Sequence, residues 1–331
     1  MDKPLIGITM GDPAGIGPEI AAKALTTPEI QMIANCLVIG DRKAMREGLR
    51  VAKIANIEIN PVKKPSEAKF TRGVIDVLDL KNADPSKIKL GQVSKNAGNA
   101  AFEYIDTAIK LAMDGKIDGI TTGPINKEAL HKAGHKFQGH TEILASRTKT
   151  KNYGMLFISD TLWIILVTTH IPLKEVSKQL DKGKILNAIK LAHETLYKLR
   201  GKKPRIAVAG LNPHAGESGI FGDEEEKIIQ PAVDAAKKLG IDVKGPISAD
   251  AVFYLANIGM YDIVVSMYHD QGLIPLKLLS FNRSVNVTVG LPIIRTSVDH
   301  GTGFDIAGKG WANPQSLVQA IKVAAHFARN K

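Results

Sequence analysis

The sequence has very little cysteine and few aromatic residues. Only one of its 331 residues, Cys36, is a cysteine, and Phe, Trp and Tyr together make up 5%. A single cysteine cannot form a disulfide within the chain, which is typical of proteins of the cytosol, and we expect Cys36 to be a small core residue. The scarcity of aromatic side chains leaves few platforms on which nucleic-acid bases could stack.

The sequence also lacks long apolar runs. No segment reaches the roughly 18 consecutive apolar residues of a membrane-spanning helix, and the most apolar one, residues 162–167, has the length of a buried strand. The first residues contain neither the apolar core nor the small-residue cleavage site of a signal peptide. We therefore expect a cytoplasmic protein without a membrane partner.

Positive charge is in excess but is not concentrated. The formal net charge is +11, yet the lysines are spread along the chain and no five basic residues follow one another. Together with the scarce aromatic residues, this pattern argues against a nucleic-acid partner. A basic chain of this kind also suits an anionic small substrate.

Short apolar runs alternate with helix-like patterns along the chain. The clearest helix pattern covers residues 100–113, with Ser94 or Asn96 as its N-cap candidate. The alternation predicts an α/β protein with a largely parallel sheet, and the length suffices for two domains. The predicted strands are 5–10, 36–39, 74–78, 117–121, 154–158, 162–169, 205–209, 262–267 and 285–289, and the other predicted helices are 184–199, 223–239, 248–257 and 313–329.

Three of the nine histidines share a setting. His170, His214 and His269 each follow an apolar run that we expect to be a parallel strand. Open α/β sheets place ligands at the carboxyl ends of their strands, so three such imidazoles are able to converge on one divalent metal. No short ligand motif links them, and the spacing alone is equally compatible with three unrelated loop histidines.

Two further groups of polar residues suit an anion. His140 and Thr141 begin a helix-like stretch whose N-terminus would favour a phosphate, although an N-cap threonine beside an uninvolved histidine has the same pattern. Phosphates are usually bound by lysine and arginine on a rigid scaffold; Lys277 and Arg295 are such residues, and they occur together with the amide of Asn286 in or after successive apolar segments.

Glycine-rich segments lie near both ends of the sequence. Residues 11–19, GDPAGIGPE, have neither the G-K-[S/T] ending of a P-loop nor the G-x-G-x-x-G spacing. They resemble the Gly-Asp-Gly-Ile-Gly-Pro-Glu turn of the isopropylmalate and isocitrate dehydrogenases, with extra residues inserted. Residues 298–314, VDHGTGFDIAGKGWANP, are similar to the adenosine-binding loop of the same enzymes.

Six motifs together resemble a narrower family. GDPAGIGPE, TGPINK, GHTE, LNPHAGE, YHDQG and GLPIIRTSVDHGT are similar to motifs of the 4-hydroxythreonine-4-phosphate dehydrogenases of vitamin B6 synthesis and their paralogues. The resemblance extends over residues 7–314. It implies an isocitrate/isopropylmalate dehydrogenase-like fold, with two α/β/α domains and an active site in the cleft between them. We expect a cofactor-side domain of residues 1–125 and 275–331, and a substrate, metal and dimerisation domain of residues 126–274.

The resemblance also implies roles for individual residues. It makes His170, His214 and His269 the metal ligands, with His269 supplied by the partner subunit, so that the active site requires a homodimer. The substrate would be a four-carbon acid phosphorylated at C4. Its implied contacts are His140, Thr141, Lys277, Asn286 and Arg295, and the implied cofactor contacts are His300, Gly301, Thr302, Asp305 and Asn313.

The implied activity is oxidation of the substrate's C3 hydroxyl to a ketone by NAD, followed by decarboxylation. A divalent metal would bind the C3 oxygen and its C2 neighbour; imidazoles suit zinc, cobalt or nickel, whereas magnesium or manganese would bind more loosely. Asp250 and Lys277 are the candidates for the general base. Asp305 would accept a hydrogen bond from a ribose 2′-hydroxyl and repel a 2′-phosphate, which predicts NAD rather than NADP.

One departure from the family pattern concerns the substrate. After LNPHAGE the chain has Ile220 and Phe221 where the vitamin B6 enzymes tend to have a glycine and a histidine. This form resembles the paralogues that act on D-threonate or D-erythronate 4-phosphate, so both substrate classes stay open. An acyl or phosphoryl transferase on the same fold is a more distant alternative, since a fold does not determine a function.

Overall fold

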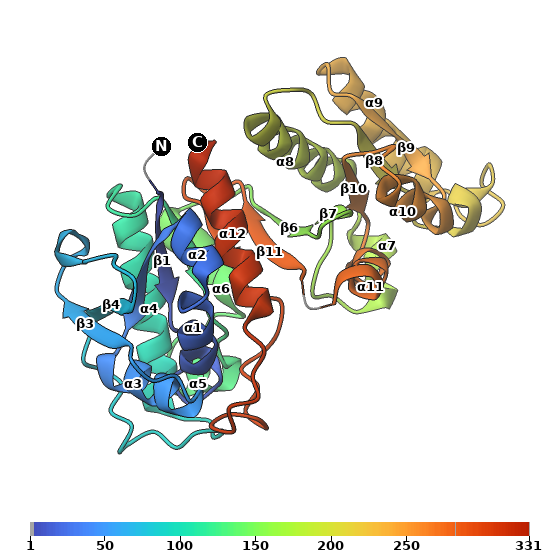
Figure 1. Ribbon diagram of the computed structural model, residues 1–331. Coiled ribbons are helices and arrows are strands. Elements are labelled where there is room, and N and C mark those ends of the chain that lie inside the picture. The colour runs from blue at the N-terminus through green and yellow to red at the C-terminus, as the bar shows by residue number, and fades with distance from the viewer. Residues whose placement is uncertain (1–2, 282, 331) are drawn as a thin grey trace. The chain divides into compact units, whose positions relative to one another are not determined.

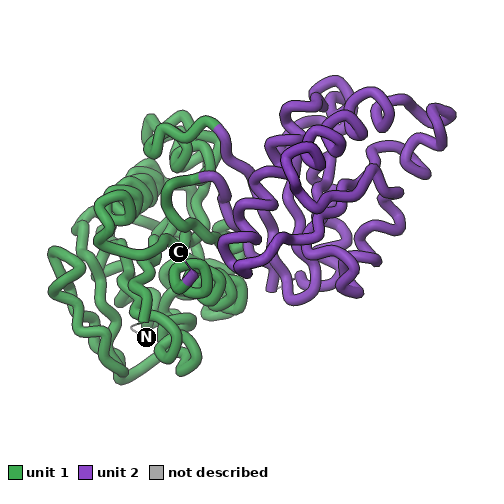
Figure 2. The backbone as a smooth tube through the Cα atoms, turned by 90° about the horizontal axis from the view of Figure 1, so that it is seen from above, with its two compact units in different colours: residues 1–151, 291–329 green, residues 152–290, 330–331 purple. Residues whose placement is uncertain are grey.

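The computed structural model describes residues 3–281 and 283–330 and divides into two compact units (Figure 2). Unit 1 comprises residues 1–151 and 291–329, and unit 2 comprises residues 152–290 and 330–331. Strands and helices alternate in both units, as the sequence pattern predicts (Figure 1).

Both divisions lie later in the chain than the expected ones after residues 125 and 274. The helices α5 (Lys127–Lys132) and α6 (His140–Thr148) pack against α4 (Lys95–Met113), which makes them part of unit 1. The strand β11 (Val285–Val289) pairs with β6 (Gly154–Ile158), which makes it part of unit 2. The strands β6 and β11 are distant in sequence, so composition does not reveal that they pair.

The sheet of unit 1 is parallel throughout. Each of its strands runs parallel to the strand beside it, and the fully buried Ile6, Ile8, Leu37 and Ile39 fill its centre. Its strands, in spatial order, are β3 (Glu58–Val62), β4 (Val74–Asp79), β2 (Asn35–Gly40), β1 (Leu5–Thr9), β5 (Gly119–Thr122) and β12 (Arg295–Ser297).

Helices cover both faces of this sheet. The connection from β1 to β2 runs toward the β3 edge, and the connection from β4 to β5 runs the other way. Because parallel crossovers are right-handed, α1 and α4 lie on opposite faces. The α4 helix begins after the expected cap, Ser94, whose hydroxyl accepts a hydrogen bond from the Ala97 N–H. The remaining helices of unit 1 are α1 (Gly17–Leu25), α2 (Pro28–Ile33), α3 (Arg42–Val51), the 3₁₀ turn η1 (Pro65–Glu67) and α12 (Gln315–Arg329).

The sheet of unit 2 is mixed. Its parallel part has the order β7 (Trp163–Leu166), β10 (Ile263–Ser266), β8 (Ile206–Ala209) and β9 (Val243–Ile247). The strands β11 and β6 precede β7 in this order, and β6 runs antiparallel to both of its neighbours. The short turn between β6 and β7, closed at Ser159 and Leu162, reverses the chain between these two strands. The helical segments are η2 (Leu173–Glu175), α7 (Val176–Gln179), α8 (Lys182–Arg200), η3 (Pro213–Gly216), η4 (Glu225–Ile229, π-helical), α9 (Gln230–Lys238), α10 (Ala249–Asn257) and α11 (His269–Ser280).

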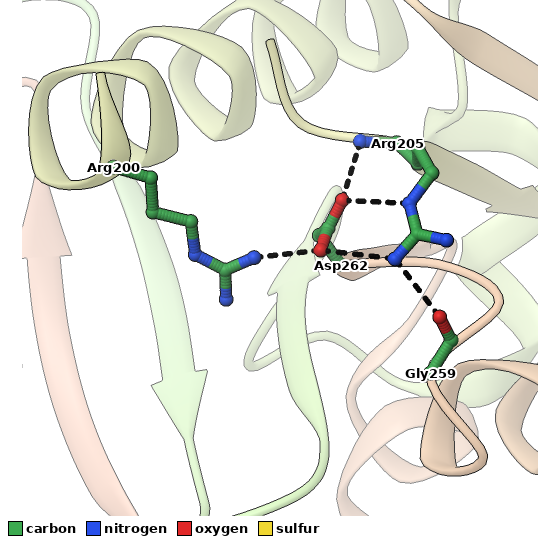
Figure 3. Close-up of polar contacts among 4 residues, drawn as sticks. All are labelled: Arg200, Arg205, Gly259 and Asp262. Atoms are coloured by element: carbon green, nitrogen blue, oxygen red, sulfur yellow. Dashed lines mark hydrogen bonds and ion pairs between the residues drawn. The ribbon is translucent and has the colours of Figure 1, made fainter. Parts of the chain in front are cut away.

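An ion-pair cluster stabilises the amino edge of the parallel strands in unit 2 (Figure 3). Asp262, just before β10, accepts hydrogen bonds from the Arg205 N–H at 2.7 Å, from Arg205 Nε at 3.1 Å and from Arg200 Nη1 at 2.6 Å. Arg205 also donates to the Gly259 carbonyl at 2.8 Å. One carboxylate therefore joins the end of α8 to the beginnings of β8 and β10.

Among the residues that the structure describes, none of the helices combines the length and the hydropathy that crossing a membrane requires.

Candidate active site

The three histidines lie at the carboxyl edge of the unit 2 sheet. β7, β10 and β8 are adjacent parallel strands, and they are followed in that order by His170, His269 and His214. His170 precedes η2, His269 is the first residue of α11, and His214 lies in η3. All three thus follow parallel strands, as the sequence analysis expected.

One buried side chain connects these strand ends. Gln271, on the first turn of α11, accepts a hydrogen bond from the Met267 N–H at 2.7 Å and donates one to the Gly210 carbonyl at 2.7 Å. The Thr168 hydroxyl donates to the Met267 carbonyl at 2.7 Å. These groups are buried, so their hydrogen bonds do not compete with water. They hold together the turns from which the three histidines project.

The imidazoles do not all meet within the chain. His170 and His269 have ring centroids 5.9 Å apart, somewhat more than the roughly 5 Å of two imidazoles bound to one ion at about 2 Å. His214 lies beside Phe221 instead, with ring centroids 6.1 Å apart. Within residues 3–281 and 283–330, no three His, Cys, Asp or Glu side chains are arranged to hold a metal. The three-histidine metal site therefore stays a prediction.

Asp250, a candidate base, lies near one of these histidines. It is exposed on the first turn of α10, close enough to His214 for their charges to interact. A hydrogen bond from the Ser248 hydroxyl is the main reason that the pKa of Asp250 is lowered from its ordinary value. The side chain is therefore a carboxylate at neutral pH, able to accept a proton.

The expected substrate residues divide between the units. Lys277 lies in α11, its ammonium 5.3 Å from the centroid of the Phe281 ring, and Asn286 lies in β11 opposite Phe157. Both belong to unit 2, as do the three histidines of the predicted metal site. The remaining three expected contacts belong to unit 1.

Unit 1 brings His140, Thr141 and Arg295 to one place. Arg295, the first residue of β12, donates a hydrogen bond from Nη2 to the Thr122 hydroxyl at 2.9 Å. His140 begins α6, interacts with the backbone of Gly123 and lies close to Arg295. Arg295 and Thr141 are only 3% and 8% exposed. A buried guanidinium thus lies beside an imidazole at the first turn of a helix.

Burial determines the protonation of this pair. Burial, followed by the positive charge of Arg295, lowers the pKa of His140 well below its ordinary value, so the ring is neutral at pH 7. Burial lowers the pKa of Arg295 to about 9, and the guanidinium remains charged. The Nε2 atom of His140 is shielded from solvent and has no hydrogen-bond partner among the described residues. The charged guanidinium suits a phosphate group, whose negative charge would in turn favour a protonated His140 able to donate from Nε2.

The expected adenosine loop packs on the glycine-rich first turn. The Ile16 N–H donates to the Thr302 carbonyl at 2.9 Å, and the Ala312 N–H donates to Glu19 at 2.9 Å. A Cβ atom on Gly15 would lie 2.6 Å from the Thr302 oxygen, so glycine is required there for this close approach. Residues of GDPAGIGPE therefore support the distant loop through direct hydrogen bonds and close packing.

The predicted cofactor residues differ in their surroundings within this loop. Asp305 is exposed, as a residue that contacts a ribose must be. Asn313 accepts a hydrogen bond from the Gln315 N–H at 2.9 Å, which stabilises the start of α12, and His300 Nδ1 lies 2.9 Å from the Gly301 carbonyl. Thr302 is 9% exposed. The cofactor contacts of these residues stay predictions.

Asp12 is a buried acid at the carboxyl end of β1. Its Oδ1 accepts a hydrogen bond from the Ala14 N–H at 2.8 Å, whereas Oδ2 is shielded and has no partner among the described residues. Burial raises its pKa to about 6, and the bond from Ala14 opposes this shift. Sequence reasoning assigned no role to Asp12 or Gln271, and the only available signal is that both lie inside motifs that carry the family resemblance.

Comparisons with known proteins identify the family of this chain. The family model described as "Pyridoxal phosphate biosynthetic protein PdxA" matches residues 32–324. A 4-hydroxythreonine-4-phosphate dehydrogenase of Desulforapulum autotrophicum is 49% identical over 325 residues, covering 98% of this chain and 95% of the relative. A D-threonate 4-phosphate dehydrogenase of Pectobacterium atrosepticum is 48% identical over 324 residues, covering 98% and 99% of the two chains.

Solved structures agree with these relatives. A 4-hydroxythreonine-4-phosphate dehydrogenase from Klebsiella pneumoniae has a TM-score of 0.92 and 45% identity, with 98% of each chain covered. A β-decarboxylating dehydrogenase from Thermococcus kodakarensis, 14% identical with a TM-score of 0.52 over 97% of this chain and 82% of its own, shares the fold. The expected isocitrate/isopropylmalate dehydrogenase-like fold class is confirmed. The match to the family model and the identity over nearly the whole length show that this chain belongs to the PdxA family.

Proposed function

We propose that this protein is an NAD-dependent and divalent-metal-dependent dehydrogenase that oxidises the C3 hydroxyl of a four-carbon acid phosphorylated at C4. The observation that carries the proposal is that relatives nearly half identical over nearly the whole chain are named as dehydrogenases of such 4-phosphates. The buried Arg295 and neutral His140 support it independently, because they form a site suited to a phosphate.

Phosphate binding is assigned to unit 1 residues. Arg295 supplies positive charge, and the negative charge of a bound phosphate would favour the protonated form of His140, whose Nε2–H would then donate the hydrogen bond that Nε2 lacks within the described chain. Thr141, on the first turn of α6, adds a hydroxyl and the helix N-terminus. Lys277 and Asn286 would contact the same substrate. Binding energy from the phosphate holds C3 in position for the reaction.

Metal binding is assigned to His170, His214 and His269. A divalent ion such as zinc, cobalt or magnesium, when bound, would lower the pKa of the C3 hydroxyl and stabilise negative charge that develops during decarboxylation. Neutral imidazoles are suitable ligands, and their positions after adjacent strands support the assignment. We assign one ligand to the partner subunit of a homodimer: His269 according to the family resemblance, or His214, because His170 and His269 are neighbours within one chain.

The proposed reaction has two steps, an oxidation at C3 and a decarboxylation. The C3–H hydride passes to the nicotinamide while the hydroxyl proton passes to a base. Asp250, an exposed carboxylate near His214, is the better placed of the two candidate bases, the other being Lys277. The C1–C2 bond of the resulting β-keto acid then breaks, carbon dioxide leaves, and the electron pair remains on C2 until it is protonated.

A specific observation favours the alternative substrate class. Ile220 and Phe221 are 73% and 50% exposed, and the Phe221 ring lies beside His214. These apolar side chains replace the glycine and histidine that are typical of the vitamin B6 enzymes. They favour an acid with a C2 hydroxyl, D-threonate or D-erythronate 4-phosphate, over 4-phosphohydroxy-L-threonine with its charged C2 amine.

The decisive experiment compares kcat/KM for these three substrates with NAD. A preference for D-threonate or D-erythronate 4-phosphate supports the alternative class, and a preference for 4-phosphohydroxy-L-threonine supports the vitamin B6 reaction. Activity should disappear with EDTA and return with zinc or cobalt. The His214→Ala variant should stay folded but lose metal and turnover, and full activity in that variant would refute the metal-ligand assignment. Reduction of NAD by none of the three substrates would leave a transferase as the better reading.

A further inference from the structure

His214 lies in an unusual run of left-handed backbone. The six consecutive residues 214–219 all have positive φ, with values of 52° at His214, 52° at Ala215, 44° at Glu217 and 55° at Ser218. Residues other than glycine rarely adopt this backbone conformation, because it brings their Cβ atom too close to the following carbonyl oxygen. A run of this kind persists only where its surroundings enforce it. The direction in which His214 points therefore depends on what holds the loop.

One buried carboxylate holds the start of this loop. Glu225, the first residue of η4, is 2% exposed. Its Oε1 accepts hydrogen bonds from the Leu211 N–H and the Asn212 N–H, both at 2.7 Å, and its Oε2 accepts one from Asn212 Nδ2 at 2.9 Å. Three donors from two residues just before His214 thus converge on a single side chain.

Two glycines make room for the carboxylate. A Cβ atom on Gly216 would lie 2.8 Å from Glu225 Oε2, and one on Gly210 would lie 3.3 Å from Oε1. Gly216 also belongs to the left-handed run, with a φ of 82°. Both positions flank His214 in sequence, so the loop and the carboxylate are built around each other.

The carboxylate of Glu225 is stabilised by N–H donors of the loop rather than by a cation. Among the described residues, no lysine, arginine or histidine forms an ion pair with it, and its hydrogen-bond donors all belong to Leu211 and Asn212. A buried carboxylate without a cation is costly unless N–H donors satisfy it, and here those donors are the ones that orient the histidine turn. We infer that Glu225 is the positioning residue of His214, an inference that rests on the proposed metal-binding role of that histidine.

The neighbouring acids provide matched controls. Glu224 also accepts a hydrogen bond from Asn212 Nδ2, at 2.7 Å, but it reaches no backbone N–H of the loop. The side chain of Glu226 is exposed and makes no hydrogen bond or ion pair within the described chain. Glu226→Met therefore removes the same charge one residue away, without touching the loop.

The test measures metal binding rather than activity alone. Co²⁺ is titrated into metal-free dimeric protein, with affinity from calorimetry and ligand geometry from the visible absorption of the bound ion. Glu225→Met should weaken Co²⁺ binding by about 10- to 100-fold and change the absorption spectrum, while circular dichroism stays unchanged. Glu225→Gln keeps an oxygen for the two backbone donors and should lie between Glu225→Met and the wild type. Glu226→Met should bind Co²⁺ as the wild type does.

The outcomes separate this inference from the proposed function. If His214→Ala loses Co²⁺ while Glu225→Met retains wild-type affinity and spectrum, Glu225 has no positioning role and the inference is wrong. If His214→Ala itself binds Co²⁺ normally, the proposed metal site is wrong. Should Glu225→Met fail to fold, Glu225→Gln decides: an unchanged affinity and spectrum refute the inference, and a weakened affinity with a shifted spectrum supports it.

Discussion

Asp12 should make the stability of this protein depend on pH in a direction opposite to that of most carboxyl groups. Its pKa is raised from 3.8 to about 6 because the charged form is buried. A raised folded-state pKa means that the native state holds its proton more tightly than the unfolded chain does. The resulting penalty is absent below pH 3.8, grows between pH 4 and pH 6, and is complete above pH 6.

The magnitude follows from the shift. A pKa raised from 3.8 to about 6 amounts to about 3 kcal/mol at pH 8 and to about half of that at pH 5. Asp12→Asn removes the ionisation but keeps an oxygen for the Ala14 N–H. The cost of burying an amide is the same at both pH values and cancels. The variant should therefore gain about 1–2 kcal/mol relative to the wild type between pH 5 and pH 8.

Urea unfolding of both proteins at pH 5 and pH 8, at one ionic strength, measures this change. The exposed Asp114 supplies the control, since Asp114→Asn makes the same replacement at a carboxyl group that is not buried. A difference between Asp12→Asn and the wild type that is equal at pH 5 and pH 8 would show that Asp12 titrates as an ordinary carboxyl group.

Three further substitutions test other parts of the structure. Asp262→Asn should destabilise the protein by about 2 kcal/mol, because the amide keeps only one of the two carboxylate oxygens and so loses two of the four hydrogen bonds from Arg200 and Arg205, together with the negative charge. Asp160→Asn, in an exposed ion pair, should cost less than about 0.5 kcal/mol, and equal losses in urea unfolding would contradict the assignment. Gln271→Leu leaves the buried Met267 N–H without its partner, so it should lower the unfolding free energy by about 2–4 kcal/mol and weaken Co²⁺ binding. If both the unfolding free energy and the Co²⁺ affinity are unchanged, Gln271 does not join the strand ends. Asp305→Ala should raise kcat/KM for NADP relative to NAD by about five- to tenfold, and an unchanged ratio would remove the proposed ribose contact.

Much of the fold could be predicted from the sequence because its periodic patterns are strong. The predicted strands 5–10 and 36–39 correspond to β1 and β2, and the predicted helix 184–199 lies within α8. The reversed direction of β6, antiparallel to both β11 and β7, was not predicted, since an apolar run is the same in either direction and the short turn at Ser159 decides how β6 meets β7.

The candidate site was predicted in part. Motif types identified His140 and Arg295, which the structure brings together in unit 1. The roles of Gln271 and Glu225 were not predicted, because the sequence pattern does not distinguish them. Gln271 is a glutamine two residues after His269, and Glu225 is the middle one of three consecutive glutamates. Gln271 bonds to Gly210, which follows a different strand, and Glu225 bonds to Leu211, which precedes the His214 loop. Only the structure shows that Glu225 is buried while its neighbour Glu226 is exposed.

The sequence by itself determined the alternation of strands and helices, the family, and the placement of three histidines after strands, since these depend on local patterns and motif order. Only the tertiary structure decided which strand ends are adjacent, where the units divide, and which polar groups are buried together. Those properties depend on strand order and on contacts between distant segments. The protonation of His140, Arg295 and Asp12 follows from them, because it is the surrounding burial, and not the residue type, that shifts their pKa values.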